Sequence, residues 1–238
     1  MADQPVDPKA RSARAAAITE ARLAALLALI AGFIDAYGII AYGVFVSFMS
    51  GNTTQTGYQA AQGLFGPASA SGLAILFFFL GTFAGSLFAQ PARRTMRRRV
   101  FAFVAAILAA VLGLTQLGLL ASGFGIAVVS FAMGVFNSGL SRVGAQAVSL
   151  TFVTGTLSRI GQHLALAAKR ERLADSQGPW DTHLRRALMM GRIWAGFIAG
   201  AMMSGAATPR FGAWVLLAPI AVLAALVAFE LSGDASNG

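Results

Sequence analysis

The chain has 238 residues, of which 57% are hydrophobic and only 11% charged, and its mean hydropathy is +0.70. Soluble domains average roughly a quarter charged residues, so this chain has too few polar side chains to cover a soluble surface. It has no cysteine, which excludes disulfides, thiol catalysis and cysteine metal sites. Several apolar runs reach the roughly 20 residues that cross hydrocarbon. We therefore expect an all-α, polytopic membrane protein.

In chain order, residues 1–18 are predicted to be a disordered cytoplasmic tail. An uncleaved first helix follows, because no small-residue cleavage site ends the first apolar run. A polar, uncharged segment at 45–59 comes next, and a similar segment recurs at 149–168. The remaining apolar runs predict helices, and the full set of predicted spans covers residues 22–43, 71–90, 100–121, 124–141, 187–206 and 212–229.

Three landmarks recur in the same order in the two halves of the chain. Residues 32–35 (GFID) match 134–137 (GVFN), 47–51 (SFMSG) match 151–155 (TFVTG), and 81–85 (GTFAG) match 196–200 (GFIAG). This order predicts a duplication, with a first membrane repeat at 19–121 and a second at 122–238 in one integrated bundle. The glycines at 81, 85, 196 and 200 are predicted to let helices pack closely.

The placement of charge bears on topology. The formal net charge is +9, and fourteen of the eighteen lysines and arginines lie within residues 9–22, 93–99 and 169–186. The positive-inside rule puts all three clusters in the cytoplasm. If both polar segments crossed the membrane, the middle cluster would lie outside. If each is re-entrant or half-length, about six spans in an inverted 3+3 repeat satisfy all three clusters, with both termini cytoplasmic.

Asp35 is the acidic residue well inside a predicted span, where an unpaired carboxylate is costly. It could relay a proton or cation, or it could be the fixed partner of Arg142, Arg159 or Arg192. Asn137 occupies the matching position in the second half.

The polar segments supply the other candidate residues. An exposed helix N-terminus with free N–H groups attracts anions, and the alternative is that Ser50 or Asn52 merely caps the helix. Arg159 and His163 form an i, i+4 pair, for which a structural role is the simpler reading. The substrate- or ion-binding candidates are Asp35, Ser50, Gly51, Asn52, Thr53, Gln55, Asn137, Thr154, Gly155 and Arg159.

The sequence contains no catalytic constellation, metal-binding pattern or cofactor motif, so we expect neither an enzyme nor a bound cofactor. The basic clusters lack interleaved aromatic residues, which argues against nucleic acid as a partner. Contact with anionic lipids at helix ends explains them better. Expected partners are membrane lipids and a small solute, and a homo-oligomer is compatible with the chain.

Residues 32–35 (GFID) and 45–54 (FVSFMSGNTT) resemble the YoaK-like family of bacterial membrane proteins, grouped as domain of unknown function 1275. That family carries an aspartate in its first helix, followed by a phenylalanine-led Thr-Gly-Asn. Ser50 stands here at the position of that threonine, and Thr154 with Gly155 also fits the pattern. The resemblance implies an integral inner-membrane protein of bacterial type and supplies no substrate.

Inverted repeats with half-length helices near the midplane recur in secondary transporters. The leading hypothesis is therefore a secondary transporter of a small polar or anionic solute, with proton coupling through Asp35. The alternative is a non-transporting sensor or scaffold that binds a ligand or lipid in the same polar region.

Overall fold

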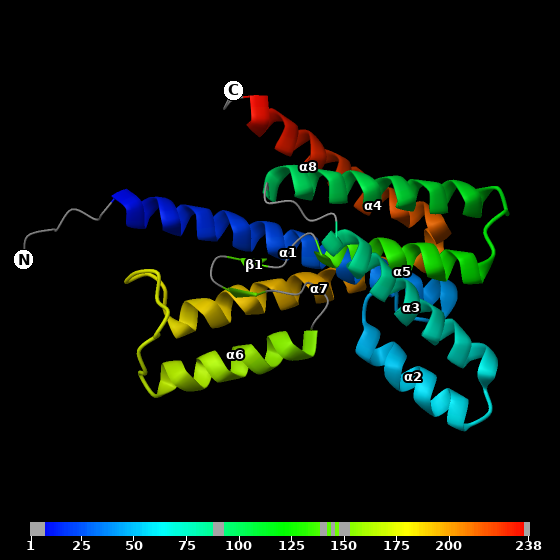
Figure 1. The fold of residues 1–238 in the computed structure, drawn as a ribbon, viewed down its shortest axis with the longest axis horizontal. Helices are drawn as coiled ribbons and strands as arrows, with labels where there is room; N and C mark the ends of the chain where they lie inside the picture. The colour runs from blue at the N-terminus through cyan, green and yellow to red at the C-terminus, as the bar shows by residue number, and fades with distance from the viewer. Residues whose placement is uncertain (1–7, 88–92, 139–141, 144–145, 148–152, 236–238) are drawn as a thin grey trace, which may run out of the picture.

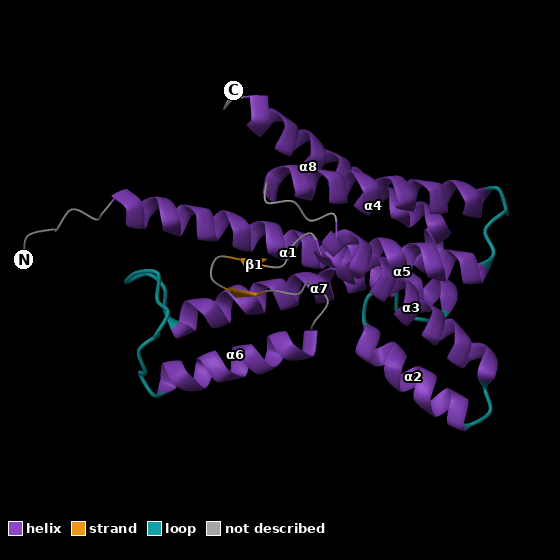
Figure 2. Cartoon of the chain, viewed as in Figure 1, coloured by secondary structure: helices purple, strands orange, loops and turns teal. Residues whose placement is uncertain are grey.

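The computed structural model describes residues 8–87, 93–138, 142–143, 146–147 and 153–235. Within these ranges the fold is helical except for one two-residue antiparallel hairpin (Figure 1, Figure 2). The elements are α1 Pro8–Tyr42, α2 Met49–Ala61, α3 Phe65–Leu87, α4 Arg93–Gln116, α5 Ser122–Ser138, β1 Arg142–Val143, β2 Gln146–Ala147, α6 Val153–Ala168, α7 His183–Phe211, the 3-10 helix η1 Gly212–Leu216, and α8 Leu217–Ala235.

Four helical stretches of the described chain are long and apolar enough to cross a membrane: Ala15–Tyr42, Phe65–Leu87, Thr95–Gln116 and His183–Leu231. The last of these joins α7 and α8 through η1, and Gly212 ends α7 with a φ of +55°. Helix α5 is apolar and has 17 residues. The polar helices α2 and α6 have 13 and 16 residues, so each is too short to cross a bilayer of about 30 Å alone.

The observed helix boundaries correct part of the sequence prediction. Helix α1 begins at Pro8, so the tail predicted to be disordered over 1–18 is helical from residue 8, and residues 1–7 lie outside the described chain. Proline suits the first turn of a helix, and the alanine-rich run at 13–17 has high helix propensity. The arginine cluster at 93–99 also belongs to a helix, because α4 begins at Arg93.

Helix α1 packs along α7, and the two backbones nearly touch at their glycines. A Cβ atom at Gly32 would overlap the carbonyl oxygen of Phe197, and one at Gly200 would overlap that of Leu29. Glycine at such a crossing lets two helices approach more closely than side chains allow. The predicted packing role of Gly200 is thus confirmed.

Helix α3 packs along α5 in the same manner. A Cβ at Gly81 would overlap the carbonyl oxygen of Phe131, and one at Gly134 would overlap that of Phe78. The packing role of Gly81 is likewise confirmed. The structure therefore contains two tightly crossed helix pairs, each with one helix from either half of the chain.

One hydrophobic cluster, centred on α1, α4, α5 and the α7–α8 region, forms the core. An ion pair of 3.0 Å between Arg97 and Glu230 joins the start of α4 to the end of α8. Many large apolar side chains face outward, among them Phe79, Phe83 and Met202. Such a surface suits contact with lipid rather than with water.

Candidate functional site

Asp35 organises the break between α1 and α2. Helix α1 ends at Tyr42, and Gly43 follows with a φ of +74°, a conformation that glycine adopts without strain. The carboxylate oxygen Oδ1 of Asp35 then accepts three backbone N–H groups, from Val46 at 2.9 Å, Ser47 at 2.7 Å and Phe48 at 3.3 Å. Asp35 is only 4% exposed. Charge-assisted hydrogen bonds of this kind offset part of the cost of burying a carboxylate.

Asn52 holds the same non-helical segment from the other side. Its side chain is fully buried, and its Oδ1 accepts the backbone N–H of Phe45 at 3.1 Å. Its Nδ2 donates to the carbonyl oxygen of Phe45. The Asn52 side-chain amide therefore bonds both the N–H and the carbonyl group of Phe45, as the backbone of a neighbouring β-strand would. These two bonds hold segment 43–48 against the first turn of α2.

The alternative in which Ser50 or Asn52 caps α2 was wrong. The helix begins at Met49, and its N-cap residue is Phe48, with no side-chain hydrogen bond to the helix end. Ser50 lies on the exposed surface. Asn52 lies inside the helix, and its amide cannot cap the helix end because it is bonded to Phe45.

The other first-half candidates have local structural contacts. Gly51 lies against the rings of Phe45 and Phe48, where a Cβ would come within 2.7 Å of the Phe48 ring. The exposed Thr53 donates its hydroxyl to the carbonyl oxygen of Met49 at 2.8 Å.

Gln55 connects α2 to the next helix. Its Oε1 accepts the hydroxyl of Ser71 on α3 at 3.1 Å, and Ser71 is fully buried. Ser71 could not be singled out from the sequence, because nothing in its neighbourhood distinguishes it from other serines in apolar runs.

The second-half candidates lie on different elements. Asn137 is half-buried at the end of α5. Thr154 and Arg159 are exposed on α6, and Gly155 is half-buried there. Helix α6 packs against α7, as α2 packs against α3. The structure therefore brings Asp35 and Asn52 together at segment 45–48, joins Gln55 to α3, and places the α6 residues in a separate helix pair.

Two buried hydroxyls on helices that both pack against α3, those of Thr56 on α2 and Ser130 on α5, have no hydrogen-bond partner within the described residues. Buried polar atoms without a partner are rare in native proteins, so these two are available to water. The same described residues contain no group of three His, Asp or Glu side chains that could hold a metal ion.

A charged cluster surrounds the start of α7. Arg186 is 8% exposed and binds Asp181 at 2.7 Å and Asp175 at 2.9 Å. Burial alone would raise the pKa of Asp181, but hydrogen bonds from Arg186 and the backbone of Gln177 hold it below its ordinary 3.8. His183 at the start of α7 lies with its Nδ1 2.8 Å from that of His163 on α6. The histidine contact joins α6 to α7, and the Arg186 ion pairs hold the α6–α7 loop against the start of α7.

Comparison with known proteins agrees with this helical membrane architecture. The model of a family described as "Protein of unknown function (DUF1275)" matches residues 23–229. The chain is also similar to the UPF0700 transmembrane protein RA0705 of Rhizobium meliloti (strain 1021), with 31% identity over 216 residues, covering 88% of this chain and 86% of that protein. No solved structure matches the chain.

Proposed function

The chain belongs to the DUF1275 family of proteins of unknown function, and we propose that it is a secondary transporter of a small polar or anionic solute. In this proposal two inverted repeats of three spans each contribute one half-length helix, α2 or α6. Both termini face the cytoplasm of a bacterial cell, and the transporter lies in the inner membrane.

The helix pairings support the proposed repeat. If α1 to α4 correspond to α5 to α8, the contact of α1 with α7 corresponds to that of α5 with α3. The contact of α2 with α3 likewise corresponds to that of α6 with α7. The glycines at the two crossings, Gly32 with Gly200 and Gly134 with Gly81 and Gly85, follow the same correspondence.

The observation that carries the transport proposal is the break between α1 and α2, held by Asp35 and Asn52. Interrupted backbone at membrane depth is tolerated only where protein or a water-filled cavity receives it, and in transporters such breaks form the site. Three N–H groups bind one oxygen of Asp35. Protonation of Asp35 would weaken these charge-assisted bonds and loosen segment 43–48, which would couple a proton to movement of α2.

The test is uptake into liposomes that contain the purified protein, with a panel of small anions and polar solutes, with and without a pH gradient. The proposal expects uptake of at least one solute that depends on the gradient. The Asp35→Asn variant keeps an oxygen acceptor but has no ionisable group, so it should lose the pH dependence. Glu171→Gln, an exposed carboxylate in the α6–α7 loop, is the matched control and should behave as the parent.

The second candidate is a non-transporting sensor or scaffold. It is favoured by one observation: the side chains of Asp35 and Asn52 bind the protein's own backbone instead of facing an open site. Saturable binding of a solute without uptake by the liposomes would establish this alternative. Gradient-dependent uptake that Asp35→Asn leaves unchanged would instead retain transport and reject the coupling role of Asp35.

A further inference from the structure

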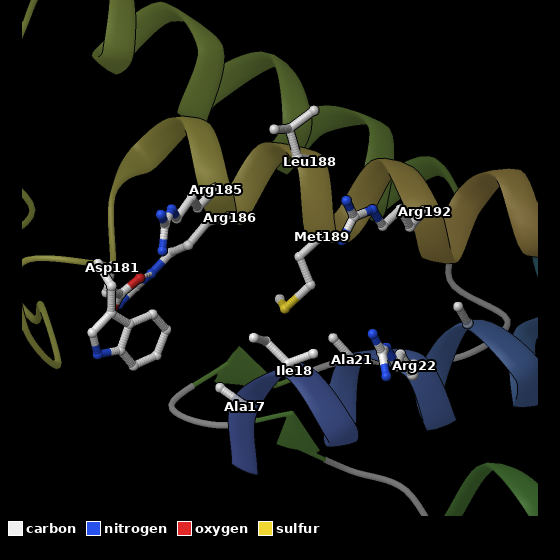
Figure 3. Close-up of a pocket in the computed structure, with 12 residues that line it drawn as sticks. Ala17, Ile18, Ala21, Arg22, Asp181, Arg185, Arg186, Leu188, Met189 and Arg192 are labelled. Carbon is white, nitrogen blue, oxygen red and sulfur yellow. Dashed lines mark hydrogen bonds and ion pairs between the residues drawn. The ribbon is translucent and has the colours of Figure 1, made fainter. Parts of the chain in front are cut away.

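A cavity of about 400 Å³ lies between the N-terminal parts of α1 and α7 (Figure 3). The backbones of these parallel helices nearly touch where Gly196 meets Ala25, and again one turn further along where Gly200 meets Leu29. Ala25 also lines the cavity, so the first of these crossings closes its inner end. The volume falls within the range of ligand pockets.

Two arginines flank the inner end of this cavity. Arg22 and Arg192 line it about one turn before Ala25 and Gly196, and Figure 3 shows both toward the same end. Neither forms an ion pair with any residue that the structure describes. Both lie about two turns inside the membrane-crossing stretches that begin at Ala15 and His183. Like charges at one level of two packed helices repel each other, and an anion between them would remove that cost.

The carboxylates near the cavity are already bound at its other end. Asp181 and Arg186 lie there (Figure 3) and form an ion pair of 2.7 Å, and Arg186 also binds Asp175 at 2.9 Å. Arg185 lines the cavity as well and has no ion-pair partner among the described residues. The protein therefore leaves an excess of positive charge in the cavity. Asp181 precedes the membrane-crossing stretch of α7, so this end opens at the membrane surface.

Between the surface end and the inner arginines the wall is apolar. Ile18 and Ala21 of α1 line this part, and Met189 extends toward them from α7 (Figure 3). Trp180, next to Asp181 in the chain, also lines the cavity. A small inorganic anion at the arginines would leave this wall facing water, whereas an apolar group attached to the anion would cover it.

We infer that this cavity binds a soluble organic anion, a carboxylate on a small apolar body, which enters from the membrane surface with the carboxylate first. The carboxylate lies between Arg22 and Arg192, and the apolar body lies along Ile18 and Met189 toward Trp180. The order of charge and apolar surface in such a ligand is the order of the lining. The inference stands independently of the proposed transport, because the cavity lies far along α1 from the break after Tyr42.

Trp180 lines the cavity and can report its occupancy. In a full-length Trp194→Phe/Trp214→Phe protein, Trp180 is the sole tryptophan. This protein is titrated in detergent micelles with benzoate, with its neutral isostere benzamide and with acetate, and the change in Trp180 fluorescence is measured. We expect benzoate to reach half-saturation at a concentration about tenfold below that of benzamide, which lacks the charge, and of acetate, which lacks the apolar body.

Substitution of the inner arginines tests the position of the carboxylate. Loss of a hydrogen bond to a charged group weakens binding about tenfold, so Arg22→Gln and Arg192→Gln should each raise the half-saturating benzoate concentration by about that factor. Neither should change the half-saturating concentration of benzamide. Arg172→Gln removes the same charge from the exposed α6–α7 loop outside the cavity and should bind benzoate as the parent does. The comparison of the three ligands needs no substitution of an arginine, so it decides the question if an arginine variant folds poorly.

Three results would overturn the inference. Half-saturation by benzoate and benzamide at the same concentration would show that the cavity does not select an anion. Half-saturation by benzoate and acetate at the same concentration would show that the apolar wall takes no part in binding. A loss in Arg172→Gln as large as in the cavity variants would show that general surface charge, and not Arg22 with Arg192, attracts the carboxylate.

Discussion

Replacing Asp35 by alanine should destabilise the protein by removing the acceptor that holds the α1–α2 break. The carboxylate accepts the N–H groups of Val46 and Ser47, which are buried, and that of Phe48, which is partly buried. A buried donor left without its partner costs about 1–3 kcal/mol. The two buried donors thus predict a loss of about 2–6 kcal/mol, because water can satisfy the third.

Asp35→Asn separates the hydrogen bonds from the charge. The amide oxygen can accept the same N–H groups, and the variant no longer buries a carboxylate. We therefore expect it to lose less than half of the free energy of unfolding lost by Asp35→Ala. The alanine loss is a large part of the about 5–15 kcal/mol that stabilises a typical protein.

The assay is equilibrium unfolding of the purified protein in mixed micelles by an increasing fraction of sodium dodecyl sulfate, followed by circular dichroism. Parent, Asp35→Asn and Asp35→Ala are compared at one protein concentration. If the alanine variant unfolded at the parent's midpoint, the three hydrogen bonds would carry no net stability. If the asparagine variant lost as much as the alanine variant, the charge would matter more than the geometry, and the reasoning above would be wrong.

Two further predictions use the same unfolding assay, and a third uses amide exchange. Gly200→Ala would place a methyl group against the α1 backbone and should lower the free energy of unfolding by about 1–3 kcal/mol. The control Gly205→Ala on the same helix meets open space and should leave that free energy unchanged. Equal effects of the two substitutions would contradict the close crossing. Asn52→Ala leaves backbone groups of a buried segment unpaired and should cost about 2 kcal/mol or more, while the exposed Thr53→Ala should stay near the parent. Because the pKa of Asp181 is lowered in the folded protein, its ion pair with Arg186 stabilises the fold above the ordinary pKa of 3.8, and this stabilisation is lost as the pH falls further. Amide exchange at the start of α7 should therefore rise only below that pH. A rise near pH 6 would exclude Asp181 as its cause.

The sequence was sufficient to predict the helical membrane class and the interruption near residue 45. Both follow from composition, because long apolar runs can satisfy their backbone in lipid only as helices and residues 45–59 are polar without being charged. The glycine contacts were also predictable, since spaced glycines in apolar helices are typical of close crossings. The extent of α1 was not, because helix propensity in its alanine-rich start competed with two early prolines and scattered charges.

The partners of Asp35 could not be predicted from residue types. The sequence suggested a proton relay or an arginine partner, yet the structure pairs the carboxylate with backbone N–H groups of residues 46–48. Every residue except proline carries such a donor, so no pattern marks the three that bind. The cavity between α1 and α7 escaped prediction for a related reason: Arg22 and Arg192 meet only through the packing of helices that are distant along the chain.

The glycine crossings determine how the polypeptide can be divided. Each crossed pair takes one helix from before residue 122 and one from after it, so a fragment that ends there would expose the glycine faces of α1 and α3 with nothing to cover them. Neither fragment would then reach its native packing by itself during synthesis. The earliest helices must wait in the bilayer until α5 and α7 have been inserted, and two fragments produced in the same cell would have to find each other to restore the fold.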